Sequence, residues 1–431
     1  MNGLHVTALL AGCATLAGVG MASAGGFNRG TADTDLIFEE GNFNMRSGVT
    51  IVMPKRGYAT LTASENLIAP GVTGSAALGL VPGQTYRSTD GRYSETYAIP
   101  SAAIKMNLSD DFRCVGTYTQ PFGADSEFGP QSITFGMAAD GTGTVREGFT
   151  SDEFGATCGY KFDLAKGRMW LLGGGFLQNF DYSQTVQFAP FVPNVPPGGT
   201  GTLSFKDDYQ PGYRLGVAYE IPEIALRAQL LYRSAVDHSP GGGNGDTFTI
   251  RAASGPAVAV FPTEGAGSLP QSVELKLQSG IAPGWLAFGS VKWTDWSVLQ
   301  RLDYTIVGAP PPLGGVKELE YYYRDGWTVS GGVGHSFTET ISGVLGLTWD
   351  RGVSTTEDTL SDTYTAAAGV AFRDPLGGEV RFGGAISYLT SASVSAEAGQ
   401  VPGAVDPGAS FAYTVDGDWS YALSAGYKVQ W

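Results

Sequence analysis

The segment YALSAGYKVQW, Tyr421–Trp431, ends the chain and decides its fold class. Apolar residues occupy every odd position, and smaller or more polar residues occupy the positions between them. Successive side chains of a β-strand point to opposite faces, so a period of two predicts a strand with one apolar face. The apolar face of this strand should meet lipid.

The same alternation recurs in residues 213–221 and again in residues 224–233. Only Pro222 and Glu223 separate the two segments. A connection this short predicts an antiparallel hairpin, because a parallel return needs a dozen or more residues.

Short turns and long loops alternate along the rest of the chain. Short turns are expected at 107–111, 163–167, 222–223, 282–284, 337–340 and 374–377, and long Gly- and Pro-rich loops at 62–95, 123–150, 183–207, 237–269, 300–317 and 392–409. Outer-membrane barrels have short periplasmic turns and longer extracellular loops. The segments between them predict an all-β fold, a transmembrane antiparallel β-barrel of about 14 strands, whose even strand number lets the sheet close without an edge.

Composition agrees with an ordered membrane barrel. The chain of 431 residues contains 63 glycines and 12% aromatic residues, but only 16% charged residues. The tryptophans near the strand ends match interfacial girdles, although core packing in a water-soluble barrel is the alternative. The net charge of −15 opposes a nucleic-acid partner.

Residues 1–24 resemble a bacterial signal peptide. An apolar run from Val6 to Met21 precedes Ala22-Ser23-Ala24, a small-residue cleavage pattern. The alternatives are a transmembrane helix and a lipoprotein box that ends at Cys13. Export by this signal predicts a location in the bacterial outer membrane.

Two cysteines, Cys114 and Cys158, remain after cleavage. In an oxidising compartment such a pair forms a disulfide more often than not, and two buried free thiols are the alternative.

Residues 25–44 differ from the predicted barrel, residues 45–431, because they show neither strand alternation nor a long amphipathic helix. Wide barrels are commonly obstructed by a folded segment, so this segment is predicted to be a hatch inside the lumen. The hatch residues of interest are Phe38, Glu39, Glu40 and Phe43. A frayed periplasmic tail is the alternative.

Enzymatic activity is not expected. After cleavage the histidines that remain are His238, in a Gly-rich loop, and His335, predicted to face lipid. Neither forms a nucleophile–base arrangement with a neighbouring serine. No cofactor or metal site is expected either.

Several motifs resemble the long-chain fatty acid transporter family of outer-membrane proteins. They are Leu269-Pro270-Gln271-Ser272-Val273, Gly284-Trp285, Trp293-Thr294-Asp295-Trp296-Ser297, Gly212-Tyr213-Arg214-Leu215-Gly216, Leu231-Tyr232-Arg233-Ser234 and 321–327. The resemblance implies a plugged barrel that takes up hydrophobic molecules, most of all long-chain fatty acids, and releases them sideways through a strand kink. An aromatic-hydrocarbon channel and a general porin are the alternatives.

The chain departs from the family at the hatch, where the usual Asn-Pro-Ala element is absent and Phe38–Phe43 stands in its place. Pro121 and Gly123 are candidates for the strand kink, since proline lacks a ladder donor and glycine permits irregular backbone. An ordinary strand end is the alternative. The expected partners are a hydrophobic ligand, outer-membrane lipid and lipopolysaccharide, and the barrel-assembly machinery, for a monomeric protein.

A fatty acid needs a cation for its carboxylate and an apolar surface for its chain. Because successive strand residues point to opposite faces, the residues between the lipid-facing ones should point into the lumen and could bind the carboxylate or the chain. They are Arg214, Arg227, Arg233, Lys292, Arg381 and Lys428 for the carboxylate, and Leu286 and Phe288 for the chain. Solvation of a wet lumen or pairing with acids such as Glu220 is the alternative role of the charges.

Overall fold

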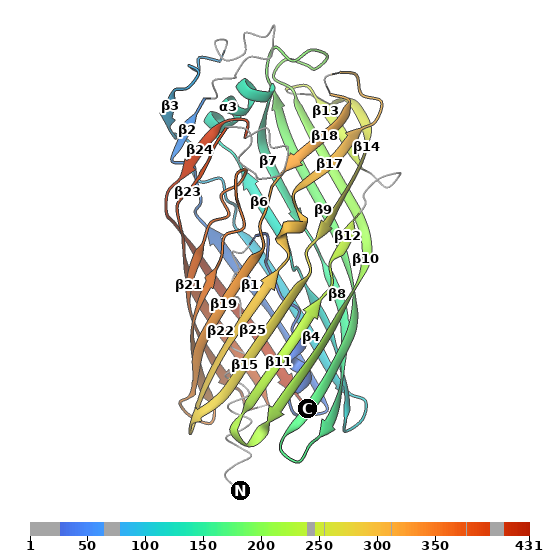
Figure 1. Cartoon of the computed structure of the whole chain (residues 1–431), viewed down its shortest axis with the longest axis vertical. Coiled ribbons are helices and arrows are strands. Elements are labelled where there is room, and N and C mark those ends of the chain that lie inside the picture. Colours follow the sequence, from blue (N-terminus) through green and yellow to red (C-terminus); the bar gives the residue numbers. More distant parts are fainter. Residues whose placement is uncertain are drawn as a thin grey trace.

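A computed structural model describes residues 26–63, 78–238, 246–253, 255–311, 313–375, 377–396 and 409–431. The predicted signal peptide, residues 1–24, lies outside them. Within the described chain, fourteen antiparallel strands form a closed barrel (Figure 1). In order around the wall they are β1 (Phe43–Pro54), β4 (Tyr97–Asn107), β5 (Phe112–Thr119), β8 (Glu153–Asp163), β9 (Arg168–Phe188), β10 (Thr200–Ile221), β11 (Leu226–Arg233), β15 (Ser272–Ala282), β16 (Trp285–Thr294), β19 (Gly326–Ser336), β20 (Ile341–Asp350), β21 (Thr363–Arg373), β22 (Gly378–Leu389) and β25 (Asp418–Gln430).

The last strand closes the barrel against the first. β25 pairs with β1 from Asn44 opposite Gln430 to Pro54 opposite Ser420. Its predicted alternation is confirmed: Leu423 is 61% exposed on the outside, whereas Ser424 is 9% exposed on the inside. The closed sheet leaves no unpaired edge in the hydrocarbon, which is the condition for a spanning β-structure.

The two ends of the barrel differ. Short turns lie at the end that carries the C-terminus, and the long connections lie at the other end (Figure 1). By the usual orientation the long connections are extracellular. They contain β2 (Thr60–Thr62), β3 (Thr85–Arg87), β6 (Gly123–Glu127), α3 (Pro130–Asp140), β7 (Thr142–Thr150), β12 (Val236–His238), β13 (Thr247–Arg251), β14 (Ala257–Leu269), β17 (Arg301–Ile306), β18 (Gly315–Glu320), β23 (Ala392–Val394) and β24 (Ala412–Val415).

Several details of the sequence prediction are wrong. The expected loop 123–150 contains β6, α3 and β7, and the expected loop 237–269 contains β13, β14 and most of β12. The expected loop 183–207 is mostly strand, because β9 and β10 continue above the membrane and bury Leu203 and Phe205 in an aromatic cluster. Trp296, expected in an interfacial girdle, is fully buried in a short 3-10 helix, η3 (Trp296–Val298), and packs inside the barrel. None of the described helices is long and apolar enough to span a membrane.

The N-terminal segment lies in the lumen as the plug. Its 3-10 helix η1 (Thr34–Phe38) buries Leu36, Ile37 and Phe38 completely or nearly so. These side chains pack against the inner wall, on Ala103, Val115, Trp170, Leu172 and Ala218. The plug is two residues shorter than the predicted hatch, 25–44, because Phe43 and Asn44 already pair with β4 in β1.

Cys114 and Cys158 form a disulfide with an S–S distance of 2.05 Å. They lie directly opposite each other in the pairing of β5 with β8. Arg113 and Val115 are buried inside, so Cys114 points to the outer face of the wall. The bond therefore ties β5 to β8 from the lipid side.

Replacing both cysteines by serine should lower the free energy of unfolding by about 2–4 kcal/mol, because the cross-link constrains the unfolded chain. Urea unfolding in lipid vesicles, followed by tryptophan fluorescence, measures the change. The wild type with a reductant is the control and should shift in the same direction. Equal unfolding midpoints with and without the bond would contradict a stabilising role.

Candidate functional site

Ion pairs hold the plug to the barrel wall. The carboxylate of Glu39 contacts Arg46 of β1 and accepts a bond from Lys428 of β25, with Nζ 2.6 Å from Oε2. Asp35 pairs with Lys276 of β15 at 3.0 Å, and Asp33 also contacts Arg46. Lys428 points into the lumen, as predicted, and its ion pair with Glu39 holds the plug against β25.

Two further cations satisfy the backbone of the plug. Lys105 Nζ donates to the carbonyl oxygens of Glu39 (2.5 Å) and Gly41 (2.7 Å). Arg113 Nη1 donates to those of Ile37 (3.2 Å) and Glu39 (3.1 Å). A single 3-10 turn leaves most of its carbonyls without internal partners, and the lumen supplies donors for them.

The four predicted hatch residues, Phe38, Glu39, Glu40 and Phe43, lie in different environments. Phe38 is buried against Trp170, with ring centroids 5.7 Å apart, and Glu39 forms the ion pairs. Glu40 has an exposed side chain. Phe43 lies in β1, with its ring centroid 5.2 Å from that of Trp431.

The upper part of the N-terminal segment fills a break in the wall. β5 ends at Thr119 and β6 begins at Gly123, so Pro121 lies between the two strands and Gly123 is the first residue of the second. This interruption fits the predicted kink and its alternative, an ordinary strand end, equally. Three backbone bonds join the two segments there: Arg29 N to Pro121 O (2.8 Å), Gly30 N to Gln120 O (2.8 Å) and Gly123 N to Phe27 O (3.0 Å). A Cβ on Gly30 would lie 2.3 Å from Thr119 Oγ1, so this approach requires glycine.

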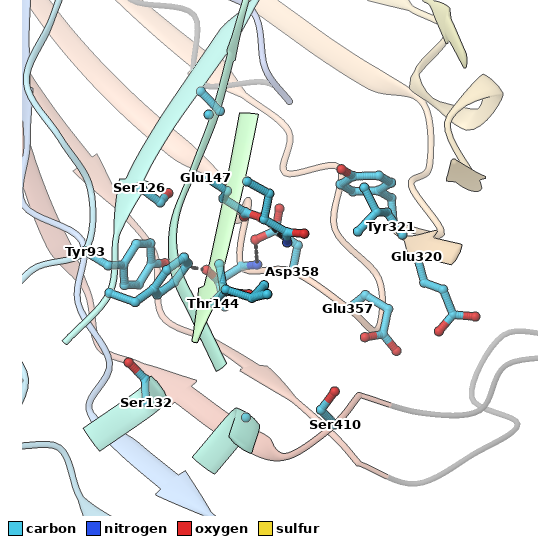
Figure 2. Close-up of a pocket in the computed structure, with 18 of the residues that line it drawn as sticks. Tyr93, Ser126, Ser132, Thr144, Glu147, Glu320, Tyr321, Glu357, Asp358 and Ser410 are labelled. Carbon is cyan, nitrogen blue, oxygen red and sulfur yellow. Dashed lines mark hydrogen bonds between the residues drawn. The ribbon is translucent and has the colours of Figure 1, made fainter. Parts of the chain in front are cut away.

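A cavity of about 1370 Å³ opens above this break, between the extracellular connections (Figure 2). Phe27 lies at its base. The ring centroid of Phe27 is 5.1 Å from that of Phe149, 5.7 Å from that of Trp296 and 5.6 Å from that of Tyr323. Phe27 also borders a second, smaller pocket with an almost wholly apolar lining. Phe27 therefore lies where the cavity and the smaller pocket meet.

Carboxylates outnumber cations in the lining of this cavity. The acids are Glu95, Asp125, Asp140, Glu147, Glu318, Glu320, Glu357 and Asp358, and the bases are Arg29, Arg56 and Lys317. Arg29 pairs with Asp125 at 2.8 Å. Arg56 donates to the carbonyl oxygens of Thr359 and Thr390. The cavity is thus an acidic compartment.

Two of these acids have altered acidity. Burial, together with the neighbouring Asp358 carboxylate, raises the pKa of Glu147 to about 7, although Gln184 Nε2 donates to it at 3.2 Å. Burial raises the pKa of Asp358 as well. Figure 2 shows both side chains at the same cavity wall.

The arginines predicted to bind a fatty-acid carboxylate already have acidic partners. Arg214 and Arg233 both pair with Glu153, and Arg233 does so at 2.8 Å. Arg227 lies 3.8 Å from Glu220, and Arg381 lies 2.6 Å from Glu379. Each of these carboxylates is shared by two arginines: Glu153 by Arg214 and Arg233, Glu220 by Arg168 and Arg227, and Glu379 by Arg373 and Arg381. The arginines therefore have acidic partners, although the wall keeps a positive excess at these pairs.

The other predicted lumen residues are dispersed. Lys292 lies opposite Glu274 in the pairing of β16 with β15. Leu286 is fully buried, and Phe288 packs against Val344 and Ala371. The structure does not bring the predicted set together as one site.

A family model described as "Outer membrane protein transport protein (OMPP1/FadL/TodX)" matches residues 50–428. The description is of a transport family and not of an enzyme family. Among curated protein sequences, none matches the chain.

Solved structures share the fold at low sequence identity. A Pseudomonas aeruginosa FadL homologue is 13% identical, with a TM-score of 0.67 over 92% of this chain and 91% of that one. The Pseudomonas putida toluene transporter TodX is 12% identical, with a TM-score of 0.58 over 96% of each chain. The Ralstonia pickettii toluene transporter TbuX is 12% identical, with a TM-score of 0.57 over 95% of this chain and 97% of that one.

Glu39→Ala should loosen the plug, because removing one partner of a buried ion pair costs about 3–5 kcal/mol when the opposite charges stay buried. Small-solute conductance in planar bilayers should rise. Glu40→Ala, which removes an exposed carboxylate from the adjacent position, is the matched control and should leave the conductance unchanged. Equal conductance of the two variants would contradict the assigned role of Glu39.

Acidification should stabilise the β6–β7 hairpin. The raised pKa of Glu147 means that the folded state binds its proton more tightly than the unfolded state, so this contribution is full below the ordinary pKa and is lost as the pH rises through about 7. The protection factors of the β7 amides, which are the intrinsic exchange rates at each pH divided by the observed rates, should rise between about pH 8 and about pH 6 by this linkage. Glu147→Gln should reduce the pH dependence, and an unchanged dependence in that variant would refute the assignment.

Proposed function

We propose that this chain, which belongs to the outer membrane protein transport protein family (OMPP1/FadL/TodX), admits small hydrophobic molecules across the outer membrane by passive diffusion. The observation that carries the proposal is the large extracellular cavity with aromatic rings at its base, placed directly above a lumen that the plug occupies. A concave site with apolar rings suits an apolar solute. An open aqueous porin would need a clear lumen, which the plug opposes.

The route leads from the cavity past Phe27–Gly30 to the break between β5 and β6, and from there sideways into the membrane. Only three backbone bonds join the N-terminal segment to residues 120–123. Such bonds contribute about 1 kcal/mol each. The ion pair of Arg29 with Asp125 and the packing of Phe27 on Phe149 and Trp296 also hold the segment, so opening the route requires these contacts to break as well. Departure of the segment would uncover the break in the wall.

The cargo is better supported as an uncharged or cationic hydrophobic molecule than as a fatty acid. The described lining of the extracellular cavity carries eight carboxylates against three basic residues, which opposes the entry of a fatty-acid anion, and the lumen arginines already contact Glu153, Glu220 and Glu379. Two of the similar structures are named toluene transporters. Long-chain fatty acids stay a prediction from the family resemblance, and growth of a deletion strain on toluene against oleate would separate the two cargoes.

A cross-link between Asn28 and Phe122 tests the route, since these residues face each other in an isolated antiparallel bridge. In the double variant Asn28→Cys/Phe122→Cys, oxidation should block toluene uptake by cells, and a reductant should restore it. The single variant Phe122→Cys controls for loss of the aromatic ring, and the reduced wild type controls for the native disulfide. Uptake at the wild-type rate with the cross-link formed would refute the route.

A further inference from the structure

The deepest carboxylates of the extracellular cavity have no basic partner. Glu147 Oε2 accepts a bond from Gln184, and Asp358 accepts bonds from the hydroxyl of Tyr323 (2.5 Å) and the amide of Thr359 (2.6 Å). Within the described chain, no Lys or Arg nitrogen lies within 4.0 Å of either carboxylate. Arg146, the neighbour of Glu147, turns away to Glu127. Glu147 and Asp358 therefore lie at one wall without a direct ion pair, and Arg56, which donates to backbone carbonyls, is the basic group whose charge acts on Asp358.

Tyrosine rings line the cavity around this acidic pair. The ring centroid of Tyr58 lies 4.9 Å from those of Tyr93 and Tyr413, and Phe128 stacks on Tyr93 at 5.5 Å. Tyr321 lies near Asp358 (Figure 2). The faces of aromatic rings attract cations, and rings combined with carboxylates are the usual surroundings of bound organic ammonium groups.

The hydroxyl group of Tyr182 is a separate indication that the cavity binds a ligand. The hydroxyl of Tyr182 is buried and has no hydrogen-bond partner in the described chain. Tyr182 lines both the cavity and the smaller apolar pocket beneath it. An unpaired buried hydroxyl costs free energy, so this position favours a ligand that places a polar atom there.

The composition of the site favours an organic cation over a metal ion. Among the described residues, no group of three or more His, Cys, Asp or Glu side chains is arranged to hold a metal. Oxygen-bound metals such as Ca²⁺ take six to eight ligands, which two carboxylates cannot supply. Ring faces also contribute nothing to the coordination of such an ion.

A smaller apolar pocket of about 50 Å³ adjoins the cavity and offers an apolar surface to the start of a ligand tail. Its lining includes Phe27, Phe149, Phe180 and Phe205, and Tyr182 stands where it meets the cavity. A molecule with a cationic head at Glu147 and Asp358 would direct its tail toward Phe27, the residue that closes the route below.

We propose that the extracellular cavity binds amphiphiles with an organic ammonium head group, held by Glu147, Asp358 and the surrounding tyrosine rings. The inference rests on the proposed function, because it names a substrate class for the same cavity. It predicts selection by the sign of the head-group charge and not by the apolar tail alone.

Three probes with the same tail test it: hexyltrimethylammonium, hexanoate and 1-hexanol, titrated into the full-length protein in an uncharged detergent. The ammonium probe should bind about tenfold more tightly than 1-hexanol, and hexanoate more weakly still. Glu147→Gln and Asp358→Asn should each weaken the ammonium probe by about tenfold and leave 1-hexanol unchanged. Unchanged binding of 1-hexanol also shows that the variants keep the cavity.

Glu127→Gln is the matched control, because Glu127 lies on the same hairpin, outside the cavity lining, and should have no effect. Equal binding of hexanoate and the ammonium probe, or full ammonium binding by Glu147→Gln, overturns the inference. If toluene uptake persists in that case, the proposed function stands. If the protein neither binds 1-hexanol nor takes up toluene, the proposed function falls together with the inference.

Discussion

The structure depends on one constraint: in hydrocarbon, every backbone amide and carbonyl must find a partner within the protein. The pairing of β25 with β1 meets it by closing the sheet. Closure separates two environments, because each strand then turns alternate residues to lipid and to the lumen. The lipid-facing side chains can all be apolar. The lumen-facing side chains must instead contact water, form pairs with one another or contact a cargo.

Many of the lumen-facing side chains of this barrel are cationic, and the plug supplies carboxylates and carbonyl oxygens that bind them. Lys276 and Lys428 meet the carboxylates of Asp35 and Glu39, while Lys105 meets backbone carbonyls. Removing either side alone would leave buried charges uncompensated, which costs more than the pairs gain. The plug is therefore part of the electrostatic balance of the wall as well as an obstruction in the lumen.

This balance explains what the sequence could predict and what it could not. Period and turn length are local, so the strands and their faces could be predicted from neighbouring residues. Partners across the barrel are not local: Arg233 pairs with Glu153, which lies on a strand 80 positions earlier in the chain. Alternation shows that both side chains point inward, but it gives no measure of their distance. The sequence could therefore name pairing with acids such as Glu220 as an alternative role of the arginines, but it could not identify Glu153 as the partner of Arg214 and Arg233. The position of Trp296 could not be predicted for a similar reason. A tryptophan just after a strand end is typical of an interfacial girdle, and only the folded structure shows that Phe27 packs against it inside the barrel.

The cavity is the least local feature, and its chemistry follows from its position. Glu147 comes from β7 and Asp358 from the connection between β20 and β21, so only the assembled extracellular face brings them together. Above the membrane, the buried carboxylates Glu147 and Asp358 can bind a proton or a cation, whereas Asp35 and Glu39 of the plug already form ion pairs with cations of the lumen. The same N-terminal segment connects the two levels: Glu39 pairs with lumen cations, and Phe27 closes the cavity from below. A ligand tail that displaces Phe27 would loosen the backbone bonds of Arg29 and Gly30 to the break in the wall. The lining of the cavity and the backbone bonds to residues 120–123 thus depend on the same short stretch of chain, Phe27–Arg29.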